Sequence, residues 1–315
     1  MPGVTSELAL AAKAKSASGA DANRADLPEV SVVIVTWNSG EELLDCVRSL
    51  HANPPSVNWE AIVVDNGSTD GSIEELRSRF PLTRVVANRR NRGLAAANNQ
   101  GIAASRGAFV LISNPDVIYS AGAVDALLDL MRRRPRTAFA IAKHVHPDGE
   151  LQPAAGDLPT IPEALLGQRL LRRGSAGLTG VWWHSWPHDE ERPVGHGAEA
   201  CYLVRRSAIG EIGLQDERFV LDWEGLDWSR RAWQAGWEIW FCPSAVVTHL
   251  GGVSIGKAIP RWVVSSHLGM YRYFAASTPS RVRPLLAAAV GIRAITKFAA
   301  AAFGVRAYVL ARRSA

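Results

Sequence analysis

Short apolar runs alternate with segments of helical spacing through the first half of the chain, and this alternation limits the possible folds more than any other feature. Apolar and β-branched residues predict four buried strands, at residues 30–36, 60–64, 83–87 and 108–112. Helical spacing after these runs predicts helices at 41–50, 72–80, 94–104 and 121–133. Strands that alternate with helices of this length form βαβ units, so the sequence predicts an α/β fold with a mostly parallel central sheet and flanking helices.

The alternation ends after residue 133, and Pro, Gly, His and Trp become frequent between residues 144 and 200. The elements predicted beyond that point are strands at 198–204 and 238–241, helices at 206–212, 224–235 and 261–274, and an alanine-rich C-terminal helical segment at 281–313. Residues 1–28 lack the apolar core of a signal peptide, so we expect a disordered N-terminal tail. The three cysteines form no disulfide framework, which favours a reducing, cytoplasmic compartment.

Polar residues or glycines follow each of the four predicted strands. They lie at residues 36–38, 65–67, 87–92 and 113–116. The carboxyl ends of parallel strands meet at one edge of a sheet, and open α/β sheets bind their ligands at that edge. A turn or a helix cap explains any single polar strand end, but four at the same edge indicate a nucleotide cleft.

The segments around Asp116 and Arg92 have features of a diphosphate site. Pro115 ends the fourth predicted strand and holds Asp116 just beyond it, where a carboxylate can bind a divalent metal that binds a diphosphate. Arg89, Arg90 and Arg92 precede a predicted helix start, and both cations and helix N-termini attract phosphate. A plain turn and a solvated basic loop are the alternative interpretations. No Gly-x-Gly-x-x-Gly motif follows the first strand, so a nicotinamide site is not expected.

Three carboxylates, Asp222, Glu224 and Asp227, lie within six residues at a predicted helix start. They can supply a general base and acceptor-binding acids, or they can only cap the helix and compensate its dipole. His249 lies in a glycine-rich turn after an apolar run, where it could bind a metal or a phosphate or be structural. Residue types alone therefore leave open whether these residues take part in catalysis or binding or only stabilise the fold.

Tryptophans are concentrated in the same half of the chain. Trp183, Trp223 and Trp228 have aromatic faces of the kind that stack on sugars, and core packing is the alternative for them.

Charge is distributed unevenly along the chain. The net charge is +5, yet the segment after Glu238 has no Asp or Glu and carries ten Lys and Arg, which leaves the preceding residues at about −5. A basic tail indicates an anionic partner surface, and the absence of base-reading motifs argues against nucleic acid. No apolar run in 281–313 reaches the roughly 18 residues that span a bilayer. The segment is expected to lie on an anionic membrane surface, or to pack on the domain.

In this order, the motifs between residues 30 and 252 resemble those of family 2 glycosyltransferases with the GT-A fold. The most specific match is 64–72 (VDNGSTDGS), which resembles the nucleoside-binding motif of the family. Residues 91–99 resemble its helix start, and Asn114-Pro115-Asp116 stands where many members have Asp-x-Asp, as in a rhamnosyltransferase-like subgroup. Residues 219–231 and 248–252 resemble the acceptor side of the family.

The resemblance implies a nucleotide-diphospho-sugar transferase fold and inverting sugar transfer. It places the catalytic domain at 29–255, with a donor half at 29–142 and an acceptor half at 143–255, before a basic helical segment at 256–315. The implied substrates are a nucleotide-diphospho-sugar donor, with dTDP-rhamnose as the candidate, and a glycan or polyprenyl-diphosphate-linked acceptor in cell-envelope polysaccharide synthesis. The protein would act at the cytoplasmic, inner face of the cell membrane, and its oligomeric state is left open.

Site residues also follow from the resemblance. Those expected to bind the nucleotide sugar are Thr36, Asn38, Asp65, Asn66, Arg92, Gly93, Asn114 and Asp116. Asp116 and His249 are expected to hold Mg²⁺ or Mn²⁺. The residues expected to bind the acceptor are Asp222, Trp223, Trp228 and Trp183.

The sequence departs from the family at one important position. The family usually has Glu-Asp where this chain has Glu224-Gly225, and the Asp is the expected base. Gly225 has no side chain to accept a proton, so the base is expected to be Glu224 or Asp227, with Glu224 favoured. The alternative is a non-catalytic protein that binds a nucleotide sugar or a glycan and has lost the usual base.

Overall fold

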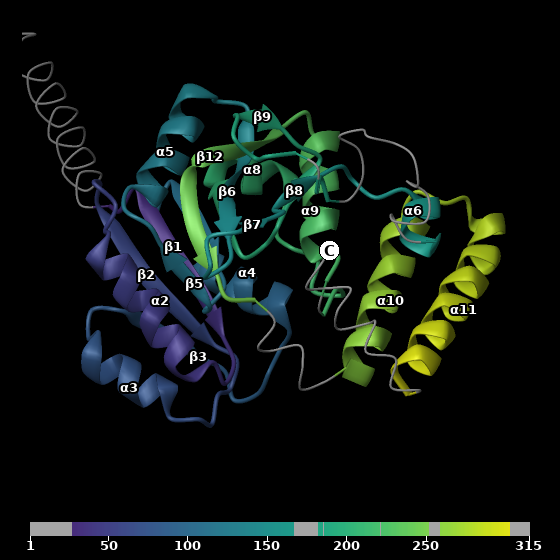
Figure 1. Ribbon diagram of the computed structural model, residues 1–315, viewed down its shortest axis with the longest axis horizontal. Coiled ribbons are helices and arrows are strands. Elements are labelled where there is room, and N and C mark those ends of the chain that lie inside the picture. The colour runs from purple at the N-terminus through teal and green to yellow at the C-terminus, as the bar shows by residue number, and fades with distance from the viewer. Residues whose placement is uncertain (1–26, 167–181, 185, 221, 252–258, 303–315) are drawn as a thin grey trace, which may run out of the picture.

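The computed structural model describes residues 27–166, 182–184, 186–220, 222–251 and 259–302. A mixed sheet with helices on both faces forms the centre of the molecule (Figure 1). Its first half is built from β1 (Val30–Thr36), α2 (Gly40–Ala52), β2 (Trp59–Asp65), α3 (Ser72–Arg79), β3 (Arg84–Ala87), α4 (Leu94–Ala104) and β4 (Phe109–Ser113). The predicted alternation of strands and helices is confirmed in this half.

The second half completes the sheet and adds a helical extension. Its elements are β5 (Val117–Tyr119), α5 (Ala123–Arg133), β6 (Thr137–Val145), β7 (Leu151–Gln152), β8 (Ala155–Gly156), α6 (Ile161–Leu166), β9 (Arg192–Pro193), β10 (His196–Gly197), β11 (Cys201–Arg205), α8 (Arg206–Ile212), α9 (Glu224–Gln234), β12 (Glu238–His249), α10 (Ile259–Ala275), a 3₁₀ turn (Ser280–Val282) and α11 (Arg283–Ala302). The order in the main sheet is β3-β2-β1-β4-β11-β6-β12-β5, with β7 beside β6 and β9 beside β12.

The longest parts of the sheet that were not predicted from the sequence are β6 and the end of β12, and the short strands β5, β7 and β9 were not predicted either. β6 is a nine-residue strand, TAFAIAKHV, whose alanines are poor strand formers, and neighbouring strands on both sides hold it in the sheet. β12 was expected to end at residue 241 but continues to His249. Pro243 resembles a strand end, yet the pairing of β12 with β6 shifts between Cys242 and Val246, and this bulge absorbs the proline.

Successive residues of β1 point to opposite faces of the sheet and join different cores. Val32 and Ile34 belong to the core that includes buried residues of α2, α3 and α5, whereas Val33 and Val35 belong to the core that includes buried residues of α4, α8 and α9. A strand that is buried on both faces needs a continuous apolar run, and this explains the sequence of β1.

Strand register places the polar strand ends at one edge of the sheet. Thr36 pairs with Asp65, Asp65 pairs with Ala87, and Ser113 lies beside Ile34 near the end of β1. All three pairings are parallel, so the polar residues that follow these strands come out at the same edge. The predicted alignment of the four strand ends is confirmed.

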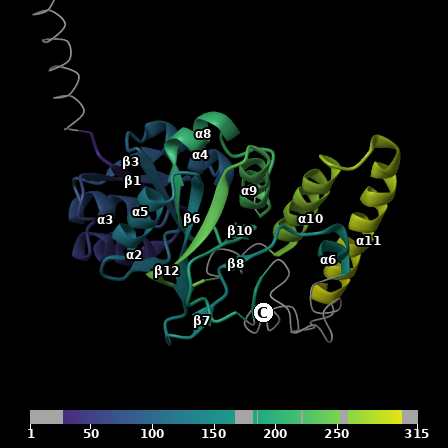
Figure 2. The same ribbon diagram turned by 90° about the horizontal axis from the view of Figure 1, so that it is seen from above.

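Helices α10 and α11 pack against each other at one side of the sheet, together with α6 (Figures 1 and 2). A third core joins them to the rest of the molecule. Its buried residues are Ala164, Phe219, Met270, Tyr273, Phe274, Leu286 and Val290. Among the described residues, no helix has the length and apolarity needed to cross a membrane. The expected tail at 1–28 lies almost wholly outside the described residues, as do the last residues of the expected helix at 281–313.

Candidate active site

Asp65 and Asn66 organise the loop that follows β2. The Asp65 side chain accepts a hydrogen bond from the Ser68 backbone N–H at 2.8 Å, which fixes the turn into α3. Asn66 accepts hydrogen bonds at Oδ1 from the Arg92 backbone N–H and from the Asn88 side chain, both at 3.2 Å, and donates to the Gly93 carbonyl at 3.2 Å. One buried amide thus joins the ends of β2 and β3 to the start of α4.

The loop after β1 is tied to the same edge. Asn38 has a positive φ of 51°, its backbone N–H donates to the Ser68 hydroxyl at 2.9 Å, and its Oδ1 accepts from the Thr69 N–H at 2.7 Å. Thr36 is buried and donates to the Ser39 hydroxyl at 3.0 Å. Asn38 therefore lies beside the loop that follows Asp65, as expected of one nucleotide-binding edge.

Gly93 and Arg92 form the entry to α4. Gly93 has φ +89°, and an added Cβ would lie 3.2 Å from the Val220 carbonyl oxygen, so glycine is required both for backbone conformation and for space. The Arg92 side chain is exposed, which leaves its guanidinium available at the helix start. A cation beside a helix N-terminus is a suitable partner for a diphosphate.

Asp116 and His249 meet at the other side of this edge. The antiparallel pairing of Val117 with His249 brings them together, and Asp116 Oδ1 lies 3.4 Å from His249 Nε2. Asp116 Oδ2 accepts a hydrogen bond from the Gly251 N–H at 3.2 Å. Burial opposes ionisation of Asp116, but the nearby His249 ring and the hydrogen bond from Gly251 outweigh it, so the pKa of Asp116 lies below its ordinary value.

The Asp116–His249 pair fits a divalent metal that takes its other ligands from a substrate. Asp116 Oδ1 is buried without a hydrogen-bond partner, which is the arrangement expected of a ligand oxygen. His249 Nδ1 lies 2.9 Å from Gln152 Oε1, an acceptor that favours the proton on Nδ1 and leaves Nε2 free to ligate. No three His, Cys, Asp or Glu side chains gather as a complete metal centre in the described ranges, so oxygens of a bound diphosphate would have to complete the shell.

Gln152 is a site residue that sequence reasoning missed. It belongs to the two-residue strand β7, which pairs with β6 at His144, and no local pattern marks it. The buried ring of His144 lies 5.7 Å from that of His249, and burial and the charge of His249 lower the pKa of His144 to about 3. His144 therefore stays neutral beside the candidate metal site.

Glu224 is the first residue of α9 and is almost completely buried. Burial raises the pKa of Glu224 well above its ordinary value, and the nearby Glu199 carboxyl raises it further. Glu224 Oε2 is buried without a hydrogen-bond partner among the described residues, and the two carboxyls of Glu224 and Glu199 lie close together at the start of α9. The expectation that Glu224 is the base stays a prediction.

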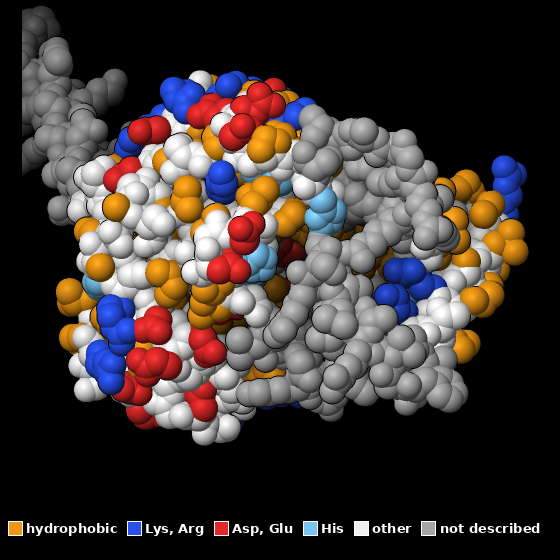
Figure 3. All heavy atoms as spheres, in the orientation of Figure 1, with side chains coloured by type: hydrophobic (Ala, Val, Ile, Leu, Met, Phe, Trp, Pro, Cys, Tyr) orange, Lys and Arg blue, Asp and Glu red, His pale blue; other side chains and the backbone are white. Residues whose placement is uncertain are grey.

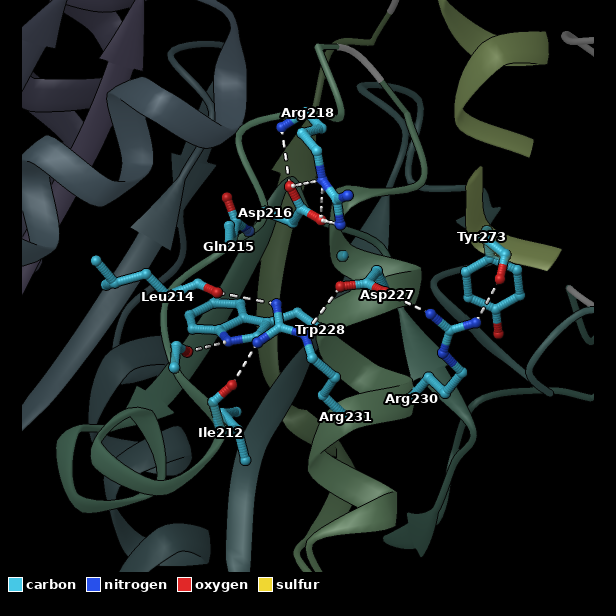
Figure 4. Close-up of polar contacts among 12 residues, drawn as sticks. Ile212, Leu214, Gln215, Asp216, Arg218, Asp227, Trp228, Arg230, Arg231 and Tyr273 are labelled. Atoms are coloured by element: carbon cyan, nitrogen blue, oxygen red, sulfur yellow. Dashed lines mark hydrogen bonds and ion pairs between the residues drawn. The ribbon is translucent and has the colours of Figure 1, made fainter. Parts of the chain in front are cut away.

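Asp227 is held by two arginines (Figure 4). Its Oδ1 lies 2.5 Å from Arg230 Nη2 and its Oδ2 lies 2.8 Å from Arg231 Nε, and only 8% of the side chain is exposed. Each oxygen is paired with a guanidinium group, so Asp227 stabilises the start of α9. The alternative expectation, that Asp227 is the base, stays a prediction.

Glu199 is the second residue that sequence reasoning missed. It lies just before β11, and its Oε1 accepts a hydrogen bond from the Gly225 backbone N–H at 2.8 Å. Its Oε2 is buried and has no hydrogen-bond partner. Burial raises the pKa of Glu199 to about 7, although the bond from Gly225 opposes that rise. Position 225 was identified from the sequence as the unusual one, but nothing in the sequence linked it to residue 199.

The three expected acceptor-binding tryptophans have different surroundings. Trp228 has no exposed surface, packs against Phe139 and donates to the Gly213 carbonyl at 2.8 Å, so the expectation that it stacks on a sugar is wrong for this conformation. Trp183 is buried as well and donates to Asp157 at 3.1 Å. Trp223 is half-buried and packs on Tyr273 and Phe274 of α10. For Trp228 and Trp183 the alternative of core packing is the observed one.

Asn114 and Asp222 are two further residues that the sequence predicted to bind substrate. Asn114 donates its backbone N–H to the Ala200 carbonyl at 2.8 Å, which extends the β4–β11 pairing beyond the strands. Asp222 directly precedes Trp223, and both have positive φ, 62° and 73°. Two such residues in succession are strained, and strain of this kind is concentrated at functional sites.

Comparison with known proteins finds relatives that cover most of the chain. Residues 31–185 match the glycosyl transferase family 2. The N-acetylglucosaminyl-diphospho-decaprenol L-rhamnosyltransferase of Mycobacterium tuberculosis is 32% identical over 268 residues, which are 78% of this chain and 83% of that protein.

Solved structures share the fold at lower identity. The mannosyltransferase PcManGT from Pyrobaculum calidifontis, solved in complex with GDP-Man and Mn²⁺, has a TM-score of 0.53 and 15% identity and covers 91% of this chain and 80% of its own. GalNAc-T7, solved with UDP, GalNAc and Mn²⁺, has a TM-score of 0.53 and 19% identity and covers 71% of this chain and 44% of its own. The expected GT-A-like fold is confirmed. By fold, by the family match and by its identity to a relative across most of both chains, the protein belongs to glycosyl transferase family 2 and is a glycosyltransferase.

Proposed function

We propose that the protein transfers rhamnose from dTDP-rhamnose to a polyprenyl-diphosphate-linked sugar, with inversion at the anomeric carbon, in the synthesis of a cell-envelope polysaccharide. The observation that carries this proposal is the shared edge of the sheet, where Asp65, Asn66 and Arg92 lie beyond β2 and β3 and the Asp116–His249 pair lies beyond β4. It offers hydrogen-bonding groups for a nucleoside and charge for a diphosphate. The acceptor class is proposed from the 32% identical relative, whose printed name includes diphospho-decaprenol.

Each group at this edge has a role in the proposed reaction. Asp65 and Asn38 would bind the nucleoside, and Arg92 would bind the diphosphate at the start of α4. Asp116 and His249 would hold Mg²⁺ or Mn²⁺, which would neutralise charge on the departing diphosphate. The acceptor hydroxyl would attack the anomeric carbon while the bond to the diphosphate breaks and a carboxylate takes the hydroxyl proton. Asp222 and Trp223 remain candidates for contacts with the acceptor.

A transfer assay with purified protein tests this proposal. The protein is incubated with Mn²⁺ or Mg²⁺, a polyprenyl-diphosphate N-acetylglucosamine acceptor and a panel of nucleotide sugars, and the lipid product is analysed by mass spectrometry. We expect dTDP-rhamnose to give product and to raise the melting temperature in the presence of metal. Asp116→Asn should lower kcat/KM by about 10²–10³-fold, because the leaving group loses its electrostatic stabilisation.

The outcomes separate this proposal from its alternative. Stabilisation by a nucleotide sugar without transfer or donor hydrolysis would indicate a binding protein. Full activity of Asp116→Asn would contradict the metal assignment. Transfer of a different sugar would correct the donor and leave the reaction class standing.

We also propose that residues 29–255 form the catalytic domain and that the following helices bind the membrane surface on the cytoplasmic side. Exposed apolar residues lie on both helices: Val264, Leu268, Leu285, Ile292, Ile295 and Phe298. In Figure 3, apolar side chains gather along the outer side of α11, with basic side chains close to them. No acidic residue follows Glu238. Apolar contact together with positive charge suits an anionic lipid surface, where a polyprenyl-linked acceptor would be found.

A further inference from the structure

Gly225 has no room for a side chain because a carboxylate fills the space. A Cβ added at Gly225 would lie 2.2 Å from both Cδ and Oε1 of Glu199. Real Cβ atoms do not approach other heavy atoms this closely, so a side chain at position 225 would have to displace the Glu199 carboxylate from its present place. Where a side chain of residue 225 would begin, the structure has the acidic group of Glu199.

The two oxygens of Glu199 have different environments. Oε1 accepts the Gly225 backbone N–H at 2.8 Å, which fixes the carboxylate at the start of α9. Oε2 is buried and has no partner among the described residues. An ionised carboxylate needs more than one donor when it is buried, so this oxygen can accept a further hydrogen bond from a ligand. A cavity of about 10 Å³, which can hold about one water molecule, adjoins this carboxylate and is also lined by Gly197, Gly225 and Ser229.

Strand pairing places Glu199 next to the candidate metal turn. Cys201 pairs with Ser113, and the Asn114 backbone N–H donates to the Ala200 carbonyl, so Glu199 lies one residue beyond this pairing on the β11 side and Pro115 lies one residue beyond it on the β4 side. Asp116 is the next residue after Pro115. Glu199 therefore lies between the donor edge of the sheet and the start of α9, as a group that acts on an acceptor hydroxyl must.

We propose that Glu199 is the catalytic base of this glycosyltransferase and that its carboxylate, supplied from the start of β11, does the work of the aspartate that Gly225 replaces. This inference rests on the proposed function. In the step, Glu199 Oε2 takes the proton of the acceptor hydroxyl, and the hydroxyl oxygen forms a bond to the anomeric carbon. The bond from that carbon to the diphosphate oxygen breaks, and its electron pair leaves with the nucleoside diphosphate.

Glu199→Gln tests the proposal with little structural change. The glutamine carbonyl can still accept the Gly225 N–H, so the fold and donor binding should persist, but the side chain can no longer take a proton. We expect kcat to fall by about 10²–10⁴-fold with nearly unchanged KM and unchanged stabilisation by the nucleotide sugar. Glu211→Gln is the matched control, because Glu211 accepts one hydrogen bond, from Trp237 at 2.9 Å, and is exposed on α8.

A swap of the two positions provides a second, independent test. Gly225→Asp alone should lower the melting temperature and the activity, because its side chain collides with Glu199. The double variant Glu199→Gly with Gly225→Asp removes the collision and puts one carboxylate back in the same space. It should recover folding and at least ten times the kcat of Glu199→Gly alone.

Each outcome decides the proposal. Glu199→Gln that keeps more than a tenth of the wild-type kcat would overturn it, and so would a folded double variant no more active than Glu199→Gly. If Glu199→Gln loses stability, the double variant alone decides. A wild-type protein that transfers no sugar with any donor would instead reject the proposed function, so the two failures are distinguishable.

Discussion

The orientation of His249 toward Asp116 depends on Gln152, a residue to which no direct contact with substrate or metal is assigned. Gln152 lies 2.9 Å from His249 Nδ1, and its carbonyl oxygen selects the tautomer in which Nε2 faces Asp116. Such supporting groups influence metal affinity because they fix both the orientation of the ring and the position of its proton.

Gln152→Leu should therefore weaken metal binding while the fold persists. With nucleotide sugar present, the Mn²⁺ concentration that gives half-maximal stabilisation should rise by about 10–100-fold, because the ring of His249 loses its supporting hydrogen bond. Gln152→Glu is the matched control, since it keeps an acceptor for Nδ1 and should retain or strengthen binding. Equal Mn²⁺ affinity in the leucine variant would show that Gln152 does not orient His249.

The pH dependence of the reaction should report on Glu199. Burial raises the pKa of Glu199 to about 7, and Asp222 contributes through its negative charge. A base must be deprotonated, so kcat should fall about tenfold per unit as the pH drops below about 7. Glu199→Gln should lack this limb, and a wild-type profile that is flat from pH 5 to 8 would contradict the assignment.

Stability should change in the opposite direction over the same pH range. The folded protein holds the Glu199 proton more tightly than the unfolded chain, whose carboxyl has the ordinary value near 4.5. The contribution of this group to stability is therefore complete below that ordinary value and is lost as the pH rises through about 7. Denaturant titrations at several pH values measure this contribution to the free energy of unfolding, with Glu199→Gln as the comparison.

At the scale of single elements, two carboxylates at the start of α9 have different roles: Asp227 stabilises the fold, and Glu199 is the one assigned to the reaction. Asp227 binds Arg230 and Arg231, and Arg231 also donates to the Leu214 carbonyl at 2.9 Å, so the helix is fixed to the preceding loop (Figure 4). Glu199 approaches the same helix from the segment just before β11 and accepts a hydrogen bond from the Gly225 N–H. A carboxylate at a helix start can thus serve the fold, the reaction or both, and its partners decide which.

Asp227→Asn should cost stability more than chemistry. Removal of one partner from a largely buried ion pair leaves the arginines without compensation, so we expect a loss of about 3 kcal/mol in the free energy of unfolding. The kcat of the folded variant should stay within about threefold of the wild type, since no step is assigned to Asp227. Asp45→Asn, which removes an exposed partner of Arg48, should change stability by less than about 1 kcal/mol. A large loss of kcat in a stable Asp227→Asn would return Asp227 to the list of candidate bases.

At the scale of the whole molecule, the two C-terminal helices have one packed side and one exposed side. Leu286 and Val290 of α11 enter the core shared with α10 and α6, whereas Ile292 and Ile295 remain exposed. Packing on the domain, one alternative for this segment, is confirmed for the first side. It does not compete with membrane binding, which would use the second side.

Ile292→Glu with Ile295→Glu should weaken binding to vesicles. Sedimentation with phosphatidylglycerol-containing vesicles should show at least a tenfold lower affinity than the wild type, because two apolar side chains are lost and two like charges face the lipid. Leu82→Glu is the control, since Leu82 is exposed in the loop before β3, away from these helices. Equal binding by the double variant, or equal binding of the wild type to neutral vesicles, would contradict the proposed surface.

The sequence by itself determined the parallel half of the fold and the residues of the donor edge. Strands β1, β2 and β4 are buried over most of their length, so their apolar runs are continuous, whereas the edge strand β3 is short and partly exposed. Local turn chemistry marks where each of the four strands ends. Residues such as Asp65 and Asp116 could therefore be located from neighbours in the chain. Their alignment followed from the rule that parallel strands end at one edge.

The tertiary structure alone decided which groups meet across that edge. Long-range strand pairing brings His249 to Asp116, Gln152 to His249, and Glu199 to Gly225, and no local pattern encodes such encounters. It also decided the surroundings of each acid: two guanidinium groups engage Asp227, and burial raises the pKa of Glu224. The sequence revealed that a carboxylate was missing at position 225, and only the packing of β11 against α9 revealed which carboxylate occupies its place.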